Sequence, residues 1–81
     1  MIVMKPTIEN FKKLEGEEVI IYYVHLFGNT VKRKGRLELD RGWAYVYDEG
    51  KSGQEFNGAF HIEDPKELKE IVGLELMEKN E

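Results

Sequence analysis

Four segments with β-strand patterns follow one another between Glu17 and Ile62, and short glycine-containing turns separate them. The second segment alternates cleanly, with Val31, Leu37 and Leu39 on one face and lysine, arginine and glutamate on the other. This alternation is typical of a strand with one buried face. Consecutive strands joined by short turns pair as antiparallel hairpins. We therefore predict a mostly β fold, in which strongly bent strands close into a small barrel.

Two glycines, Gly35 and Gly58, fall inside the predicted strands rather than at the turns. A glycine within a strand marks a bend or a place where another backbone approaches closely. The first predicted strand, by contrast, is apolar on both faces from Val19 to Phe27. We therefore expect both of its faces to be covered, one of them by the first helix or by a neighbouring subunit.

A helix is predicted ahead of the strands, at about residues 8–15. Thr7 can cap this helix, apolar residues recur within it at helical spacing, and Gly16 is placed to end it. A chain of 81 residues forms one domain, and such a domain buries only about 60 to 65% of the surface of its unfolded chain. We predict a single domain over residues 1–81, with the barrel at about 17–77.

A second helical signal precedes the last predicted strand, "LELM". Asp64 can cap this helix, Pro65 takes its first position, Glu67 stands where a capping box places a carboxylate, and Gly73 is placed to end it. The predicted architecture is therefore a five-stranded barrel with an N-terminal helix and a short helix before the last strand.

The charge of the chain limits the partners it can bind. The formal net charge of -4 argues against general binding to phosphate, because non-specific affinity for nucleic acid comes from excess lysine and arginine. A local basic stripe of Lys32, Lys34 and Arg36, with Arg33 beside it, can follow a phosphate backbone or can be a solvated strand face paired with glutamates. Charged residues make up 35% of the chain, which is typical of thermophile proteins, so we expect a thermophilic, archaeal source.

Several classes of site are not expected. Cysteine is absent, which excludes disulfides and thiolate metal sites, and His25 and His61 stand too far apart in sequence to indicate a metal site. No activated nucleophile, acid and base pair or phosphate loop can be recognised, so we expect neither enzymatic activity nor a cofactor. No stretch approaches the ~18 apolar residues of a membrane span or the pattern of a signal peptide, so we expect a cytoplasmic location.

From Thr7 to Ile62 the chain resembles Sm-like (LSm) proteins. The segment "NFKKLEGEEVIIYYVHLFGN" is similar to the helix, first strand and glycine turn of that family, and "GRLELDRGWAYVY" is similar to its second and third strands. The resemblance implies a five-stranded, strongly bent Sm-like or SH3-like barrel. It also implies a homo-oligomeric ring, joined by edge pairing between the fourth and fifth strands of neighbours, that binds single-stranded RNA by stacking a base and making polar contacts through an asparagine and an arginine.

The residues that make those polar contacts in the family are not retained. Ala44 takes the place of the asparagine, and Leu39 takes the aromatic place before Asp40. Where the family has an arginine and a glycine together, this chain has Asn57 and Gly58, so that arginine is missing too. Stacking needs only a planar side chain, which Arg41 or Trp43 can supply. The candidate RNA-binding residues implied by the resemblance are Asp40, Arg41, Trp43, Asn57 and Gly58.

Trp43, Tyr45 and Tyr47 share one face of the third predicted strand. They can form a stacking platform for single-stranded RNA, or they can belong to the core or a subunit interface, which is the commoner role of such a face. Two functions therefore compete. The first is a divergent, RNA-associated, ring-forming Sm-like module without enzymatic activity. The second is an Sm-fold scaffold or protein-interaction module that self-associates and has lost RNA binding.

Overall fold

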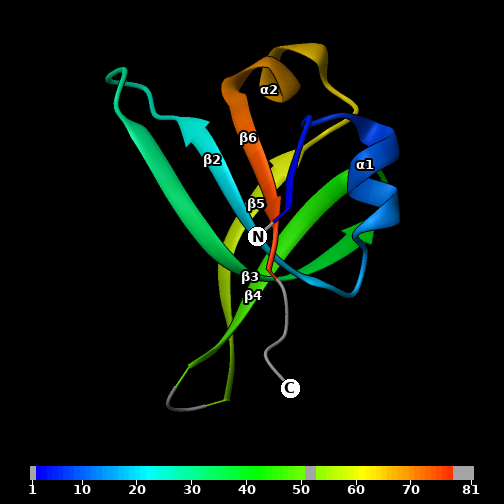
Figure 1. Cartoon of the computed structure of the whole chain (residues 1–81). Coiled ribbons are helices and arrows are strands. Elements are labelled where there is room, and N and C mark those ends of the chain that lie inside the picture. Colours follow the sequence, from blue (N-terminus) through cyan, green and yellow to red (C-terminus); the bar gives the residue numbers. More distant parts are fainter. Residues whose placement is uncertain (1, 51–52, 78–81) are drawn as a thin grey trace.

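The chain folds into one antiparallel sheet of six strands and two short helices (Figure 1). This computed structural model describes residues 2–50 and 53–77, and the side chains of residues 49–50 and 53–57 lie outside that description. The strands are β1 (Ile2–Met4), β2 (Glu18–Val24), β3 (Thr30–Asp40), β4 (Trp43–Gly50), β5 (Gly53–His61) and β6 (Ile71–Leu76). The helices are α1 (Ile8–Lys13) and α2 (Pro65–Glu70). The predicted mostly β class is confirmed.

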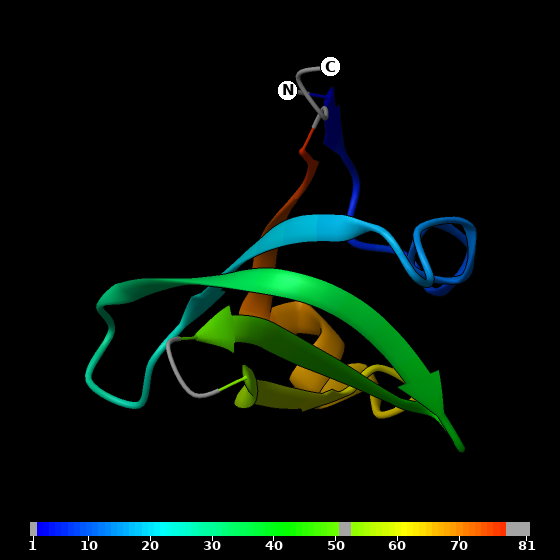
Figure 2. The ribbon, with the colours of Figure 1, turned by 90° about the horizontal axis from the view of Figure 1, so that it is seen from below.

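The hydrogen-bonded order of the strands is β1-β6-β2-β3-β4-β5. The sheet is strongly curved, and β3 arches across it (Figure 2). Within the described ranges, β1 and β5 form the two edges and do not pair with each other, so hydrogen bonds do not close the sheet into the expected barrel. The strand β1 was not predicted. It pairs with β6 over Leu74–Leu76 and therefore covers part of the edge that the family resemblance assigns to a neighbouring subunit.

The buried core lies inside the curve of the sheet. Burying an aliphatic or phenylalanine side chain stabilises a fold by about 1.5–3 kcal/mol, and here alternate residues of the strands are buried together with two residues of the N-terminal helical segment. The cluster consists of Phe11, Leu14, Val19, Ile21, Leu37, Ala44, Val46, Ile62, Ile71 and Leu74.

The inward residues of β4 are small. β4 directs Ala44 and Val46 into the core, so its aromatic residues lie on the opposite, outer face. Of the two commoner roles expected for these rings, a place in the core is therefore wrong, and a subunit interface stays a prediction. Gly35 shows how the inner face packs, because a Cβ there would lie 2.5 Å from the carbonyl oxygen of Tyr47 and 2.7 Å from Cγ1 of Val46. β3 and β4 thus approach closely at Gly35, as predicted, and Val46 packs against this glycine.

β2 is buried on both faces over its first half. Ile21 points into the core, while Ile20 on the outer face is also buried. The neighbours of Ile20 in the register are Lys34 and Glu75, whose long side chains can shield it without a helix or a subunit. The strand ends at Val24. The prediction that it extends to Phe27 is therefore wrong, because a tight turn begins at His25, whose N–H donates to the Asn29 carbonyl at 2.7 Å.

The helix before the last strand is shorter than the sequence pattern predicts. Asp64 caps α2 by accepting a hydrogen bond from the N–H of Lys66 at 3.0 Å. Glu67 does not complete a capping box, since its carboxylate accepts a hydrogen bond from the N–H of His61 at 2.6 Å. The prediction that Gly73 ends the helix is wrong, because the chain passes directly from α2 into β6 and Gly73 lies within that strand.

The first helix begins at its predicted cap. The Thr7 hydroxyl accepts a hydrogen bond from the N–H of Asn10 at 3.2 Å. Beyond the helix, Gly16 has a φ of +86° and its N–H donates to the carbonyl of Leu37 at 2.7 Å, which ties the connection to β3. In the part of the chain that is described, neither helix has the length and apolar character needed to cross a membrane.

Candidate nucleic-acid interface

Four aromatic rings form a continuous row, the aromatic ladder, on the outer face of β4 and β5. It consists of His61, Trp43, Tyr45 and Tyr47, in that order. The His61 and Trp43 rings are stacked with centroids 4.7 Å apart and planes 6° apart. The Trp43–Tyr45 and Tyr45–Tyr47 centroids are each 6.4 Å apart, with planes inclined by 25° and 29°. All four residues are half-buried, so the ladder is an aromatic surface outside the core.

Strand β3 lies beside the ladder and gives it a gradient of charge. The β3 residue opposite each ring is Arg36 for Tyr47, Glu38 for Tyr45 and Asp40 for Trp43. Arg36 and Glu38 form an ion pair, with Nε and Oε1 2.9 Å apart, which contributes little to stability because both side chains are partly exposed. Lys32 and Lys34 continue the same face beyond Arg36. Along β3, the residue beside the ladder thus changes from a cation opposite Tyr47 to a carboxylate opposite Trp43, which we call the charge gradient.

The turn between β3 and β4 carries three of the predicted site residues, Asp40, Arg41 and Trp43. Asp40 pairs with Trp43, so Arg41 and Gly42 form a two-residue loop, and their φ values of +51° and +82° are typical of the type I′ turn in hairpins. The Arg41 side chain is 92% exposed, and its Nε lies 4.0 Å from the Asp40 carboxylate. Arg41 thus stands in solvent at the acidic end of the ladder.

A pocket of about 450 Å³ lies between this turn, α1 and the residues that follow β5. The Ile62 N–H donates to the Gly42 carbonyl at 3.0 Å, and the Glu63 carboxylate occupies the space that a side chain on residue 42 would need. The charged residues that line the pocket are Lys12, Arg41, Glu15, Asp40 and Glu63. Because carboxylates outnumber cations, the pocket does not favour a phosphate group.

The other two predicted site residues lie elsewhere. Asn57 and Gly58 both lie within β5, so Gly58 is inside a strand as predicted. Gly58 pairs with Val46, which is three residues from Trp43 along β4, or roughly 10 Å at the usual rise of a strand. Asn57 is the extra residue of a β-bulge in that pairing, and its side chain lies outside the described residues. The five predicted residues are therefore not brought together into one site.

His61 is the member of the aromatic ladder that sequence reasoning missed as a site residue. It is far from Trp43 in the sequence, and the two become neighbours because β5 pairs antiparallel with β4. If residues are paired one by one outward from the predicted glycine-rich turn, Trp43 meets His61 only when the extra residue of the bulge, Asn57, is allowed for. That turn contains residues 51–52, which lie outside the described residues.

At β2, on the side of the outer face away from the ladder, the phenol of Tyr22 is neutral, and β2 itself carries no cation. Tyr22 on β2 has a pKa raised above the ordinary value of 10.0, first by burial and then by the nearby carboxylate of Glu75, to which its hydroxyl is hydrogen-bonded. The Oε2 atom of Glu75 is buried and has no hydrogen-bond partner among the described residues. Beyond the basic stripe of β3, this face therefore offers no further positive charge at β2.

Comparisons of the chain with protein-family models, curated proteins and solved structures found no match. Among the described residues, no group of three or more histidine, cysteine, aspartate or glutamate side chains could hold a metal ion. The fold and the outer face thus define a small antiparallel β protein with an exposed aromatic ladder and a basic stripe at one end of it.

Proposed function

We propose that this chain is a non-enzymatic module that binds single-stranded RNA by stacking bases on the aromatic ladder. The observation that carries the proposal is the position of Trp43, Tyr45 and Tyr47 on the outer face. Their rings lie outside the buried core. Stacking of a base on an aromatic side chain contributes ~1 to 3 kcal/mol and tolerates any base sequence. The ladder therefore replaces the polar contacts that the Sm-like resemblance would have required.

The spacing of the rings favours an extended strand. Neighbouring rings on β4 are 6.4 Å apart, about twice the ~3.4 Å rise per nucleotide along one strand of a duplex. A nucleic acid that places successive bases on successive rings must therefore be unstacked and unpaired. Single-stranded RNA meets this condition, because proteins commonly bind it with its bases splayed out.

The charge gradient along β3 determines where along the ladder the phosphate backbone of the RNA is expected. Lys32, Lys34 and Arg36 lie at the Tyr47 end, so the phosphate backbone is expected there rather than at the acidic turn around Asp40. Each phosphate contact with a single strand adds about -0.7 to the slope of log affinity against log salt. Three cations give a slope of roughly -2, a shallow dependence in keeping with a net charge of -4.

The Sm-like fold stays part of the proposal. The strands β2 to β6 follow a helix and form one strongly curved antiparallel sheet in the order β6-β2-β3-β4-β5 (Figure 2), which supports the resemblance although the sheet is open over the described ranges. We also propose that the chain self-associates. A ring contact through β6, however, would require β1 to leave the edge at Leu74–Leu76.

The fluorescence of Trp43, the only tryptophan, tests the proposal directly. Titration with short uridine and adenine oligonucleotides at low salt should give saturable quenching that weakens as salt rises. Tyr45→Leu should lower the affinity about 5- to 150-fold, which corresponds to the loss of one stacked base. Tyr45→Phe is the matched control, because it keeps the ring, and it should bind like the unmodified chain. A flat signal with both oligonucleotides at low salt would exclude the proposal.

The second candidate is a scaffold that uses the same outer face to join subunits, which the acidic net charge of the chain supports. In that case Tyr45→Glu should break the oligomer, because it places a charge within an aromatic interface. Oligonucleotides should then leave the mobility of the protein unchanged. An oligomer that keeps its size after Tyr45→Glu would count against this candidate.

A further inference from the structure

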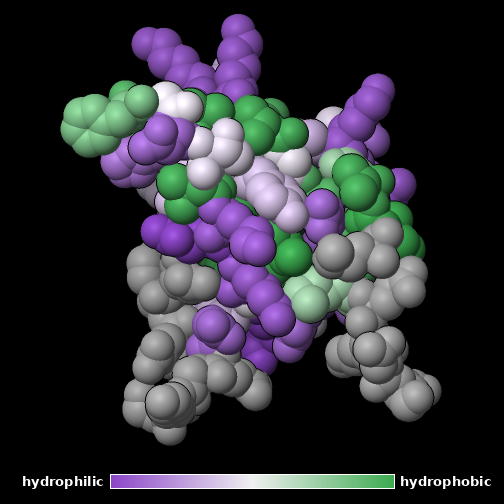
Figure 3. Space-filling view, turned by 60° about the vertical axis from the view of Figure 1, so that its left-hand side comes forward, coloured by the Kyte–Doolittle hydropathy of each residue, from purple (hydrophilic) through white to green (hydrophobic). Residues whose placement is uncertain are grey.

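The tip of the β2–β3 hairpin exposes two large apolar side chains next to each other in the sequence. Leu26 is 92% exposed and Phe27 is 84% exposed. Leaving such side chains in water forgoes about 1.5–3 kcal/mol each relative to burial. In Figure 3, hydrophobic surface at the corner that carries this hairpin stands among hydrophilic side chains. The tip is therefore a candidate for insertion into another surface.

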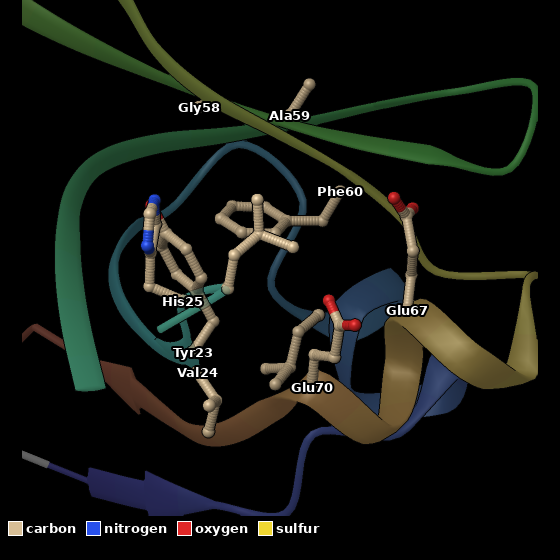
Figure 4. A pocket seen from close by; sticks show the side chains of 10 residues that line it. Tyr23, Val24, His25, Gly58, Ala59, Phe60, Glu67 and Glu70 are labelled. Carbon is tan, nitrogen blue, oxygen red and sulfur yellow. The ribbon is translucent and has the colours of Figure 1, made fainter. Parts of the chain in front are cut away.

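A pocket of about 270 Å³ opens beside this tip. Its walls come from the end of β2, the edge strand β5 and the junction of α2 with β6, and the rings of Tyr23 and Phe60 meet edge to face within it at 5.0 Å. Figure 4 shows Glu67 and Glu70, from α2, on the side opposite Tyr23. The volume is below the ~300–1,000 Å³ of typical small-molecule sites, so a side chain is a better match than a cofactor.

The pocket lies along an edge strand. Its lining includes Gly58, Ala59 and Phe60, and within the described ranges β5 pairs with β4 alone. An exposed strand edge is a template for pairing with another chain. A partner that enters this pocket can therefore gain backbone hydrogen bonds as well as apolar contact.

The hairpin and the pocket carry opposite charges. All charged residues between His25 and Leu37 are basic, namely Lys32, Arg33, Lys34 and Arg36. The acidic residues that line the pocket are Glu67 and Glu70. Arg33 is the basic residue of the hairpin that lies on the pocket's side of β3, beside Gly58, so the hairpin of a second copy brings a cation as well as apolar side chains toward Glu67 and Glu70.

The hairpin tip and the pocket are adjacent on one molecule. Leu26 lines the pocket, and the ring of Phe27 lies 5.7 Å from the ring of His25, which also lines it. In a two-fold dimer each residue contact occurs twice, once in each direction, so an interlocking dimer needs a projection next to the cavity that receives it. We propose that the Leu26–Phe27 tip of one copy occupies this pocket in a second copy, around a two-fold axis beside the edge of β5.

Sedimentation analysis of the intact chain tests this dimer. The chain has a mass of 9.5 kDa, and the unmodified protein should sediment with twice that mass. Phe27→Asp should raise the dimer dissociation constant at least about 30-fold, as expected for the loss of a central anchor. The matched control is Val3→Asp on β1, which changes a side chain that is 74% exposed and should leave the dimer intact.

A second measurement detects the contact itself. Because the chain has no cysteine, Asn29→Cys and Glu70→Cys variants, which keep the Leu26–Phe27 tip, can be mixed and oxidised. A disulfide should form between the two variants, whereas Val3→Cys mixed with Glu70→Cys should give none. Both variants can be checked for folding by circular dichroism before mixing.

Four outcomes would overturn the proposal. These are a monomer at all concentrations up to the millimolar range, a larger ring, a dimer unaffected by Phe27→Asp, and a monomer whose tip instead binds vesicles of phosphatidylserine and phosphatidylcholine. The dimer does not depend on RNA binding. Phe27→Asp should leave the quenching of Trp43 by oligonucleotides unchanged, so the two proposals fail separately.

Discussion

The aromatic ladder and the hairpin tip both expose apolar side chains, but they hold them differently. The ladder residues lie within strands that are hydrogen-bonded to their neighbours, and each ring is half-buried against the next. Leu26 and Phe27 lie on a turn and are almost fully exposed. A row of fixed rings suits a repeating planar partner. A single projection beside a cavity suits an interlocking contact instead.

The largest effect is expected when volume is removed from the core, because this destabilises the fold that supports both regions. Leu37 is fully buried in the core, so Leu37→Ala should cost about 2–5 kcal/mol of unfolding free energy. For a domain of this size the melting temperature should fall by more than about 8 °C. Thermal unfolding followed by circular dichroism measures this loss.

Leu26→Ala is the matched control, because it makes the same chemical change at a leucine that is 92% exposed. It should leave the melting temperature of the monomer nearly unchanged while weakening the dimer. A comparable loss of stability at both positions would contradict the placement of Leu37 in the core.

The next prediction separates the ladder from the pocket. Gly35→Ala places a Cβ against the backbone of Tyr47, and overpacking of this kind costs about 1–3 kcal/mol. Because the strain falls on β4 directly behind the ladder, RNA affinity should decrease together with stability. Denaturant unfolding and Trp43 fluorescence measure the two effects, and dimer formation should change much less.

Gly58→Ala is its control. A Cβ at Gly58 would meet the Phe60 ring at 3.4 Å, an ordinary contact distance. Its stability should stay within about 0.5 kcal/mol of the unmodified chain, as for substitutions away from strained positions. Equal losses at the two glycines would show that β3 and β4 do not approach closely at Gly35.

A smaller effect is expected at the helix that supports the pocket. Asp64→Ala removes the cap of α2, which should cost about 0.5–2 kcal/mol. Because α2 carries Glu67 and Glu70, the dimer should weaken while the ladder is unaffected. Thr7→Ala removes the corresponding cap of α1 and should lower stability similarly without changing the dimer. Sedimentation distinguishes the two variants, and equal dimer loss in both would argue against a role for α2.

The two regions also differ in how far the sequence predicts them. The strands β2 to β5, the turn at Arg41 and Gly42, and the caps of both helices correspond to local signals, since alternation and turn chemistry act over a few residues. The buried or exposed face of β4 could not be predicted in this way. It depends on how β4 packs in the folded chain, where Val46 lies against Gly35 and Ala44 joins the same core.

Long-range pairing accounts for the remaining differences. β1 is only three residues long, too short for a periodic pattern, and it forms by pairing with β6 at the other end of the chain. Gly73 has the chemistry of a helix terminator, but its pairing with Tyr22 places it in β6. The pocket needs β2, β5 and α2 together, so no single stretch of sequence predicts it.

The smallest predicted effect is a loss of stability at alkaline pH, which depends on Tyr22 on the outer face of β2. The pKa of Tyr22 is raised above 10.0 in the folded chain by burial and by Glu75, so folding favours the neutral phenol. The corresponding stability is fully present below pH 10 and is lost as the pH rises through the folded pKa, since the unfolded chain ionises first. Tyr22→Phe should flatten this alkaline decrease in unfolding free energy.

The two proteins differ only at Tyr22, so the difference between the two pH profiles isolates this residue. Denaturant unfolding at a series of pH values from neutral to strongly alkaline measures that difference. Identical profiles would mean that the phenol of Tyr22 is as easily ionised in the folded chain as in the unfolded one. Burial and the carboxylate of Glu75 would then not favour the neutral phenol in the folded chain, contrary to the position of Tyr22 beside Glu75 on the outer face.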